Sequence, residues 1–207
     1  MIIVFANQKG GCGKTTNCIQ FANYLAEIGK DVLVLDLDFQ RSLSDRRESD
    51  LNTYDNPPKY EVMKGELSQV ANLLGDFNAV DNGNLLIDLP GKIDDDSLGV
   101  ILKAADIIVC PFKYDRLTID STGLFIKILQ YMEVKAKIFF LPNNIRTAVR
   151  YDTKEQIVNI LNTIGEVTDE IPQSVLMERI NTLIISNEAM KLVKEPYDKI
   201  IADGKIE

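Results

Sequence analysis

A glycine-rich segment near the start of this 207-residue chain separates an apolar run from an amphipathic stretch. Residues 2–6 are apolar and rich in β-branched side chains, which is typical of a strand buried on both faces. After the segment NQKGGCGKTTN, apolar residues recur at helical spacing over 14–28, and Gly29 is the expected stop. A strand, a glycine loop and a helix in this order form a cradle for an anion. Backbone N–H groups turn inward, and the helix N-terminus adds its positive dipole.

The loop departs from the common phosphate-binding pattern G-x-x-x-x-G-K-[ST]. Gly13, Lys14 and Thr15 supply its end, but Gln8 occupies the position of the first glycine and Lys9 follows it. In such a loop Lys14 would reach the β- and γ-phosphates, and Thr15 would place its hydroxyl on Mg²⁺. The strand–loop–helix context favours a nucleotide site over a glycine-rich turn without a ligand.

Apolar runs and helical patterns alternate along the rest of the chain. The predicted strands are 2–6, 31–38, 85–89, 107–112, 137–141 and the stretch before Pro172. The predicted helices are 14–28, 66–74, 98–105, 119–132, 153–164 and 187–202. Strands that are apolar on both faces and alternate with helices predict an α/β fold, with a mostly parallel, twisted sheet and helices on both faces. We expect one domain over residues 1–207.

Two polar features stand out against this pattern. Residues 41–59 are polar and end in two prolines, so they are expected to form a loop or irregular structure. Ligands of parallel sheets bind at the carboxyl ends of the strands. Four polar residues fall at or just beyond such ends: Asp36, Asp38, Asp88 and Asn143.

Composition excludes several classes of chemistry. The chain has no histidine, which removes Ser-His-Asp catalysis and His-ligated zinc. Its three cysteines are scattered and form no C-x-x-C, so a reduced cytoplasmic setting fits best and a metal site of their own is not expected. The net charge of -8 argues against wide nonspecific contact with nucleic acid but leaves room for a local basic patch. No apolar run approaches the roughly 20 residues of a membrane span.

The segment KGGCGKTT resembles the deviant Walker A motif, K-G-G-x-G-K-[TS]-[TS], of the ParA/MinD family of P-loop ATPases. VLVLDLDFQ is similar to the family's second motif, a strand that ends in D-x-D-P-Q. LLIDLPG is similar to its third motif. VCPFKYDRLTIDSTG resembles the family's strand, loop and helix that follow, and IPQSVLMERI resembles the segment that lines the nucleotide base. The resemblance runs in order from Met1 to about Ile180 and implies the P-loop NTPase fold.

The resemblance assigns roles to particular residues. Lys9 would be the signature lysine that reaches across a nucleotide-dependent homodimer to the partner's phosphates, where an ammonium can stabilise the transferred group. Asp38 would orient or activate the attacking water, so Lys9, Lys14 and Asp38 are the candidate catalytic residues. Thr15, Asp36 and Asp88 are the candidate Mg²⁺ residues. The candidate ATP-binding residues are Lys9, Gly10, Gly11, Cys12, Gly13, Lys14, Thr15, Thr16, Asn143 and Pro172, with Asn144 as an alternative to Asn143.

Two positions in these motifs raise separate questions. Phe39 occupies the place of the family's usual proline, and loss of a fixed φ should loosen the switch loop that carries Asp38. Cys12 fills the variable position of the phosphate loop. A thiol beside a helix N-terminus can be reactive, but a small residue that fits a tight turn is the simpler interpretation.

The cellular role implied by the resemblance has two main forms. ParA-type members bind nonspecific DNA as ATP dimers and move plasmids or other cargo with a ParB-like centromere-binding or adaptor protein. MinD-type members bind membranes through a C-terminal amphipathic helix. The end of this chain, EPYDKIIADGKIE, is interrupted by Pro196 and Gly204 and has no basic amphipathic stripe, so we do not expect membrane attachment.

Composition disfavours DNA binding, because acidic residues outnumber basic ones in the C-terminal third. The candidate DNA-binding residues are Arg146, Arg150, Lys154, Lys191, Lys194 and Lys199, and the last three could equally form a solvated helix face. The alternative to partition is an ATP-gated positioning factor for a protein complex. A metabolic amidotransferase or reductase of related fold is disfavoured, because the cysteines are poorly placed for an iron–sulfur cluster.

Overall fold

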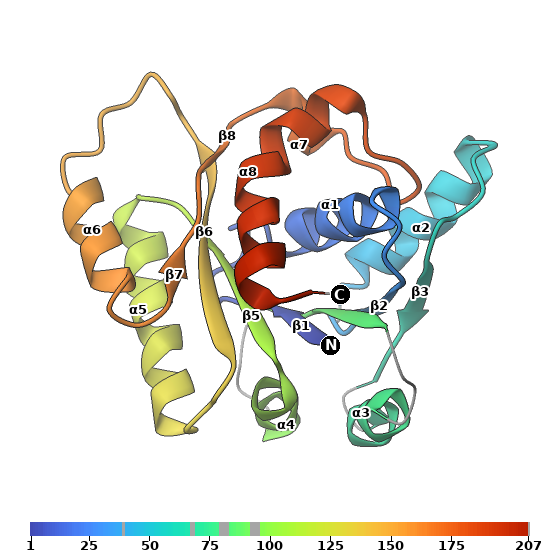
Figure 1. Ribbon diagram of the computed structural model, residues 1–207, viewed down its shortest axis with the longest axis horizontal. Coiled ribbons are helices and arrows are strands. Elements are labelled where there is room, and N and C mark those ends of the chain that lie inside the picture. Colours follow the sequence, from blue (N-terminus) through green and yellow to red (C-terminus); the bar gives the residue numbers. More distant parts are fainter. Residues whose placement is uncertain (39, 67–68, 79–82, 92–95, 207) are drawn as a thin grey trace.

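The computed structural model describes residues 1–38, 40–66, 69–78, 83–91 and 96–206. In this part of the chain every paired strand runs parallel to its neighbour, in the order β3-β2-β4-β1-β5-β6-β7, and β8 pairs with β6. The expected parallel α/β sheet is therefore confirmed (Figure 1). The strands are β1 (Ile2–Phe5), β2 (Val32–Asp36), β3 (Glu61–Lys64), β4 (Asn84–Asp88), β5 (Ile107–Phe112), β6 (Lys137–Ile145), β7 (Glu166–Val167) and β8 (Ile171–Pro172).

The central strands bury both of their faces, which explains why they read as continuous apolar runs. In β1, Ile2 and Val4 point into one hydrophobic core, whereas Ile3 and Phe5 point into the other. This alternation follows from the two-residue period of a strand. Helices must therefore cover both sides of the sheet, and they are α1 (Lys14–Glu27), α2 (Ser42–Thr53), α3 (Val70–Asn78), α4 (Asp96–Ala104), α5 (Arg116–Tyr131), α6 (Lys154–Leu161), α7 (Val175–Glu178) and α8 (Asn187–Gly204).

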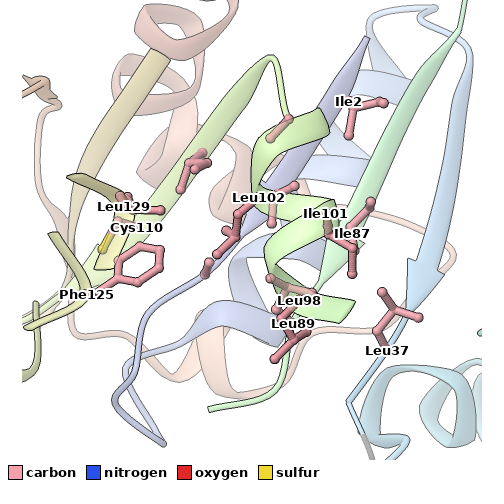
Figure 2. Packing of buried hydrophobic residues seen from close by; sticks show 14 of the residues in the cluster. Ile2, Leu37, Ile87, Leu89, Leu98, Ile101, Leu102, Cys110, Phe125 and Leu129 are labelled. Atoms are coloured by element: carbon pink, nitrogen blue, oxygen red, sulfur yellow. The ribbon is translucent and has the colours of Figure 1, made fainter. Parts of the chain in front are cut away.

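One face of the sheet is covered by α3, α4, α5 and α6. Figure 2 shows α4 side chains such as Ile101 packed over Ile87 and Leu89, with Phe125 and Leu129 of α5 alongside. All five side chains are buried. At roughly 25 cal/mol per Å² of apolar surface removed from water, such side chains supply the main stabilisation of this layer.

The opposite face is covered by α1, α2, α7 and α8, and Figure 1 shows α8 beside α1. Tyr197 of α8 is fully buried, and its ring meets the Phe21 ring of α1 edge-on at 5.0 Å. Helix α8 continues through Pro196, so the expectation that this proline interrupts the C-terminal segment was wrong. Val193, Tyr197 and Ile200 bury one side of the helix, and this packing outweighs the backbone hydrogen bond that Pro196 cannot donate.

The expectation of a loop over residues 41–59 was wrong for Ser42–Thr53, which forms α2, whereas residues 54–59 form no helix or strand. The edge strand β3 (Glu61–Lys64) follows and was not expected. Few apolar residues lie in α2, so its sequence has little helical periodicity. Long-range polar contacts hold it instead. The Asp50 carboxylate accepts hydrogen bonds from the backbone N–H and the hydroxyl of Thr182, at 2.7 and 2.9 Å.

The remaining differences concern boundaries. The helix expected at 66–74 is α3, which begins at Val70. Strand β6 runs four residues beyond the expected 137–141, to Ile145, and the strand expected before Pro172 is divided into β7 and β8. These segments lie near the carboxyl edge of the sheet, where pairing with neighbours decides how far a strand extends.

Candidate functional site

Three neighbouring strands bring the glycine loop and the strand-end acids to one edge of the sheet. Asp88 at the end of β4 lies opposite Phe5 of β1 and opposite Asp36 of β2. The glycine loop follows Phe5 directly along the chain. The glycine loop and these acids therefore lie at the carboxyl ends of parallel strands, the edge at which such sheets bind ligands.

The backbone of the loop requires glycine at two positions. Gly11 and Gly13 have φ of 74° and 101°, a region that residues with a side chain rarely adopt. Gly13 is also the N-cap of α1, and a Cβ atom on it would lie 2.1 Å from Nδ2 of Asn143. The loop thus delivers its N–H groups and the start of a long helix to one place, an arrangement suited to phosphate.

Lys9 is the centre of the loop's internal hydrogen bonds. Its carbonyl accepts from Nζ of Lys14 at 3.3 Å and from Sγ of Cys12 at 3.2 Å, and its N–H donates to Oδ1 of Asn7 at 3.2 Å. The Lys14 ammonium is buried inside the loop. The Lys9 side chain is partly exposed and has no hydrogen bond or ion pair within the described residues.

Cys12 behaves as a small buried residue. It is almost fully shielded from solvent, and burial raises the pKa of its thiol despite the opposing charge of Lys14. A raised pKa leaves little thiolate at neutral pH, so the simpler interpretation of this position fits. All three cysteines are free and buried, and no group of three acidic or cysteine side chains in the described ranges could hold a metal ion.

Two buried asparagines support the loop and were missed in the sequence. Nδ2 of Asn7 donates to the Pro111 carbonyl at 2.9 Å and to the Thr122 hydroxyl at 3.0 Å, which ties the loop to β5 and α5. Nδ2 of Asn17 donates to the Gly13 carbonyl at 2.8 Å. A polar residue at the end of an apolar strand, or on the buried face of a helix, is the signal that could have identified them.

Asp88 is the most unusual ionisable group of the site. It is 0 % exposed, and neither carboxylate oxygen has a hydrogen bond of normal geometry within the described residues. Burial raises its pKa to about 7, Asp36 adds to the rise, and the neighbouring Thr15 hydroxyl and Lys14 ammonium oppose it. A buried carboxylate without partners beside a hydroxyl suits a hard cation, so Asp88 and Thr15 fit the expected Mg²⁺.

Asp36 and Asp38 differ in their burial and in their hydrogen-bond partners. The strand ends at Asp36, whose carboxylate already accepts hydrogen bonds from the N–H and hydroxyl of Ser44, at 2.8 and 2.7 Å, and from the N–H of Asp38 at 3.2 Å. Asp36 therefore anchors α2 in this structure. Asp38 is partly exposed and accepts from the N–H of Gln40 at 2.9 Å. The expectation about Phe39 lies outside the described residues.

A cavity of about 350 Å³ opens beside the loop. Six of the predicted ATP-binding residues line it: Gly11, Gly13, Thr15, Thr16, Asn143 and Pro172. The alternative residue Asn144 lines it as well, and Nδ2 of Asn143 donates to the Cys12 carbonyl at 2.9 Å. Met177 of α7, in the segment that resembles the base-lining one, also lines the cavity, and so does Arg46 of α2, to which no pattern in the sequence pointed.

The sequence of this site and of the surrounding sheet also matches a known family. Residues 3–183 match the CobQ/CobB/MinD/ParA nucleotide binding domain. The chain belongs to this family. The resemblance to ParA/MinD-type proteins is thereby confirmed, and the family is one of nucleotide-binding domains.

Individual relatives of the CobQ/CobB/MinD/ParA family agree with this assignment. The chromosome-partitioning ATPase Soj of Thermus thermophilus is 45% identical over 64 residues, which are 31% of this chain and 24% of Soj. The matched part thus spans about a quarter of that relative. Two solved structures share the fold at low identity.

The first structure is a protein assigned to plasmid partition in Borrelia burgdorferi, with AMPPNP bound. It has a TM-score of 0.76 and 17% identity over 98% of both chains. The second belongs to the MinC:MinD cell division protein complex of Aquifex aeolicus. It has a TM-score of 0.72 and 18% identity over 97% of this chain and 96% of the other.

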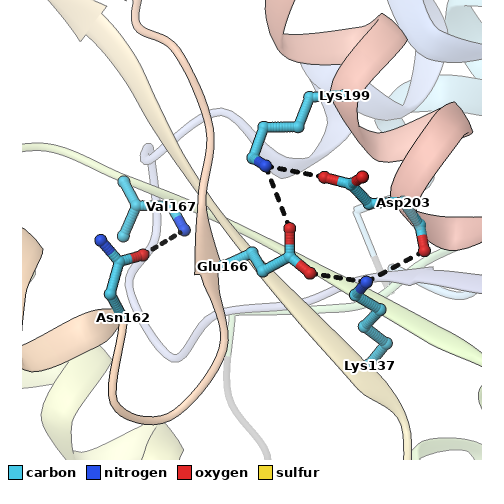
Figure 3. A network of polar contacts seen from close by, with 6 residues as sticks. All are labelled: Lys137, Asn162, Glu166, Val167, Lys199 and Asp203. Atoms are coloured by element: carbon cyan, nitrogen blue, oxygen red, sulfur yellow. Dashed lines mark hydrogen bonds and ion pairs between the residues drawn. The ribbon is translucent and has the colours of Figure 1, made fainter.

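The basic residues predicted to bind DNA differ in whether they form ion pairs with acidic side chains. Lys199 lies between Glu166 at 3.0 Å and Asp203 at 2.7 Å, a network that also includes Lys137 (Figure 3). Lys194 pairs with Asp198. The ammonium groups of these two lysines are therefore paired with acidic side chains of α8 and β7.

The candidates near the end of β6 form a second group. Lys154 pairs with Glu170 at 2.6 Å, and Arg150 lies 3.5 Å from Asp152 on an exposed surface. Arg146, and Lys191 of α8, are exposed and have no ion pair in the described part of the chain.

Among the described helices, none is long and apolar enough to cross a membrane.

Proposed function

We propose that this protein is an ATP-dependent dimerising switch ATPase that partitions plasmid or other mobile DNA with a centromere-binding or adaptor partner. The observation that carries the ATPase part is the buried Asp88 carboxylate, without hydrogen bonds in the described residues, beside the phosphate loop and Thr15. A site of this kind has positive groups for phosphates and one negative group for the metal ion that accompanies them. The ATP hydrolysis that we propose is slow and stimulated by the partner.

Each residue of the loop has a distinct part in this proposal. Lys14 exchanges its contact with the Lys9 carbonyl for the β- and γ-phosphates of ATP. Thr15 and Asp88 would hold Mg²⁺, which offsets the negative charge of the phosphates when it is bound. Asp38, partly exposed beyond the end of β2, orients the attacking water.

Lys9 supports the dimer part of the proposal. Its backbone is held by three hydrogen bonds, while its side chain makes none in the described ranges. A lysine with a fixed backbone and a free ammonium can act on the phosphates of a second copy at little cost in ordering. ATP would thus be enclosed between two chains, each supplying one Lys9, and residues 1–207 would act as one unit.

The partition part of the proposal depends on DNA. Arg146 and Lys191 are the best placed of the candidate cations, because they are exposed and carry no ion pair within the described residues. Lys154, Lys194 and Lys199 would contribute less, since each must leave an acidic neighbour to bind a phosphate. A dimer doubles such a patch, and DNA contacts of this kind weaken as salt rises.

The decisive experiment measures the mass of the protein and its retention on nonspecific duplex DNA with ATP, ADP and no nucleotide, at two salt concentrations. We expect a dimer and salt-sensitive retention with ATP only. A protein that neither binds ATP nor changes mass with it contradicts the ATPase proposal. A protein that dimerises with ATP but is never retained on DNA contradicts only the partition role.

The second candidate function is an ATP-gated positioning factor for a protein complex. The pairing of Lys154, Lys194 and Lys199 with acidic side chains favours it, because these pairs reduce the positive charge available for DNA. It predicts ATP-dependent dimerisation and a protein partner without DNA retention, so the same experiment separates the two.

A further inference from the structure

Arg46 is a cation in the wall of the nucleotide cavity that none of the sequence motifs identifies. It belongs to α2 and lines the cavity together with Thr16 and Ile19 of α1. Its Nη1 donates a hydrogen bond to the Ile180 carbonyl at 2.6 Å. The guanidinium therefore bridges α2 and the segment that follows α7, directly beside the space a nucleotide would occupy.

The bridge is one of several polar contacts that hold these segments together. Thr182 is already bound to Asp50 of α2 through two hydrogen bonds, at 2.7 and 2.9 Å. Nδ2 of Asn23 in α1 donates to the Asn181 carbonyl at 2.8 Å. Three hydrogen bonds independent of Arg46 thus fix residues 181–182. A purely structural role for Arg46 explains little.

The charge of the cavity wall gives Arg46 a second role. Among the described residues that line the cavity, Arg46 is the only cation and Glu178 the only anion. Arginine has five N–H donors in a planar fork, and only the bond to Ile180 occupies one of them in the described structure. This fork matches two oxygens of a phosphate better than it matches a single carbonyl.

The position of Arg46 along the cavity indicates which phosphate it meets. Lys14 and Thr15 serve the β- and γ-phosphates. Thr16 and Ile19 follow along α1, and α2 packs beside this helix. We propose that Arg46 is a nucleotide-binding residue whose guanidinium contacts the α-phosphate of bound ATP or ADP. This inference rests on the proposed nucleotide function and adds a contact that does not distinguish the two nucleotides.

The test compares the wild-type protein with the variants R46Q, R46K and R116Q by calorimetric titration with ATP and with ADP. R46Q should weaken both nucleotides by about tenfold or more and by the same factor, since a hydrogen bond to a charged group is lost. R46K should lie between R46Q and wild type because it keeps the charge and loses the fork. Arg116 on α5 is exposed and lies outside the cavity lining, so R116Q is the matched charge control and should bind as wild type.

The melting temperature without nucleotide separates binding from structure. The ligand-free melting temperature of R46Q should lie within the range set by wild type and R116Q. Equal affinity in R46Q and wild type overturns the inference, and so does a loss for ATP alone. A loss of affinity with a lower ligand-free melting temperature also overturns it, because Arg46 would then be a structural tie. If wild type itself binds neither nucleotide, the proposed function fails; if wild type binds and R46Q binds equally, only the Arg46 contact fails.

Discussion

The hydroxyl of Tyr197 donates a hydrogen bond to Oδ1 of Asn17 at 3.0 Å, and both residues are fully buried. Asn17 in turn donates to the carbonyl of Gly13, where the phosphate loop ends and α1 begins. The C-terminal helix is thereby linked to the loop through two hydrogen bonds.

Replacing Tyr197 with phenylalanine removes the first of these two hydrogen bonds and should destabilise the protein. The ring would still pack against Phe21, but Oδ1 of Asn17 would be left buried without a donor. We expect a loss of about 1–3 kcal/mol in the free energy of unfolding, measured by urea denaturation. Tyr131→Phe is the control, because Tyr131 is 90% exposed. Equal urea midpoints for the two variants would show that the Tyr197–Asn17 hydrogen bond does not stabilise the protein.

Asp88 should make the ligand-free protein less stable at high pH. Its folded-state pKa is about 7 against an ordinary value of 3.8, so its contribution is fully present below about pH 4 and is lost as pH rises through 7. Each pKa unit corresponds to about 1.4 kcal/mol, so the loss by pH 8 is of the order of 4 kcal/mol. Asp88→Asn cannot ionise and should remove this part of the pH dependence.

Thermal or urea unfolding of both proteins at pH 5 and pH 8, without nucleotide or metal, measures this effect. The stability of Asp88→Asn relative to wild type should be higher at pH 8 than at pH 5. The same variant should lose Mg²⁺-dependent nucleotide affinity, because an amide is a weaker ligand for a hard cation. Parallel pH profiles for the two proteins would refute the raised pKa.

Two Gly→Ala substitutions should have opposite effects. At Gly13 a Cβ would collide with Asn143 in a backbone conformation with φ of 101°, so Gly13→Ala should destabilise the protein and abolish nucleotide binding. At Gly123, inside α5, nothing lies within 4 Å of the added atom. Gly123→Ala should therefore raise stability by up to about 1 kcal/mol and leave binding unchanged. Similar melting curves for the two variants would contradict the required backbone at Gly13.

The two lysines of the loop should separate binding from turnover. Lys14→Ala removes a buried ammonium from the cradle and should weaken ATP binding by at least tenfold, since a charge-assisted contact is lost. Lys9→Ala should keep ATP binding within a few-fold but lose ATP-dependent dimerisation and hydrolysis. Nucleotide titration, mass measurement and phosphate release distinguish these effects. Lys127→Ala, an exposed change on α5, is the control and should resemble wild type.

The basic residues predicted to bind DNA should divide into those that contact DNA and those that stabilise the fold through ion pairs. Arg146→Ala and Lys191→Ala should each reduce retention on DNA in the ATP state and lower its salt dependence, because free cations are lost. Lys199→Ala should instead reduce stability modestly, since it leaves the Asp203 carboxylate without an ion pair, whereas Glu166 keeps its pair with Lys137. DNA retention and thermal unfolding of the three variants test this division. Loss of DNA retention in Lys199→Ala alone would reverse the assignment.

Several features of this protein were determined by the sequence alone. The order of glycines and lysines in KGGCGKTT defines the phosphate loop, because positive φ and an inward ammonium depend on local residue types. The buried strands β1, β4 and β5 are equally local, since continuous apolar runs suit only a sheet covered on both faces. The placement of Asp88 follows from β4, whose end it occupies.

Only the tertiary structure decided the features that depend on distant partners. Helix α2 has little apolar periodicity and is held by contacts to Thr182, Tyr60 and Asp36, so its own sequence resembled a loop. Pro196 is accommodated in α8 because its neighbours are buried against the core. The free or paired state of each lysine, and the place of Arg46 in the cavity wall, likewise depend on segments far away in the chain. Local patterns carry backbone and burial preferences, whereas such polar contacts arise only when the fold brings their partners together.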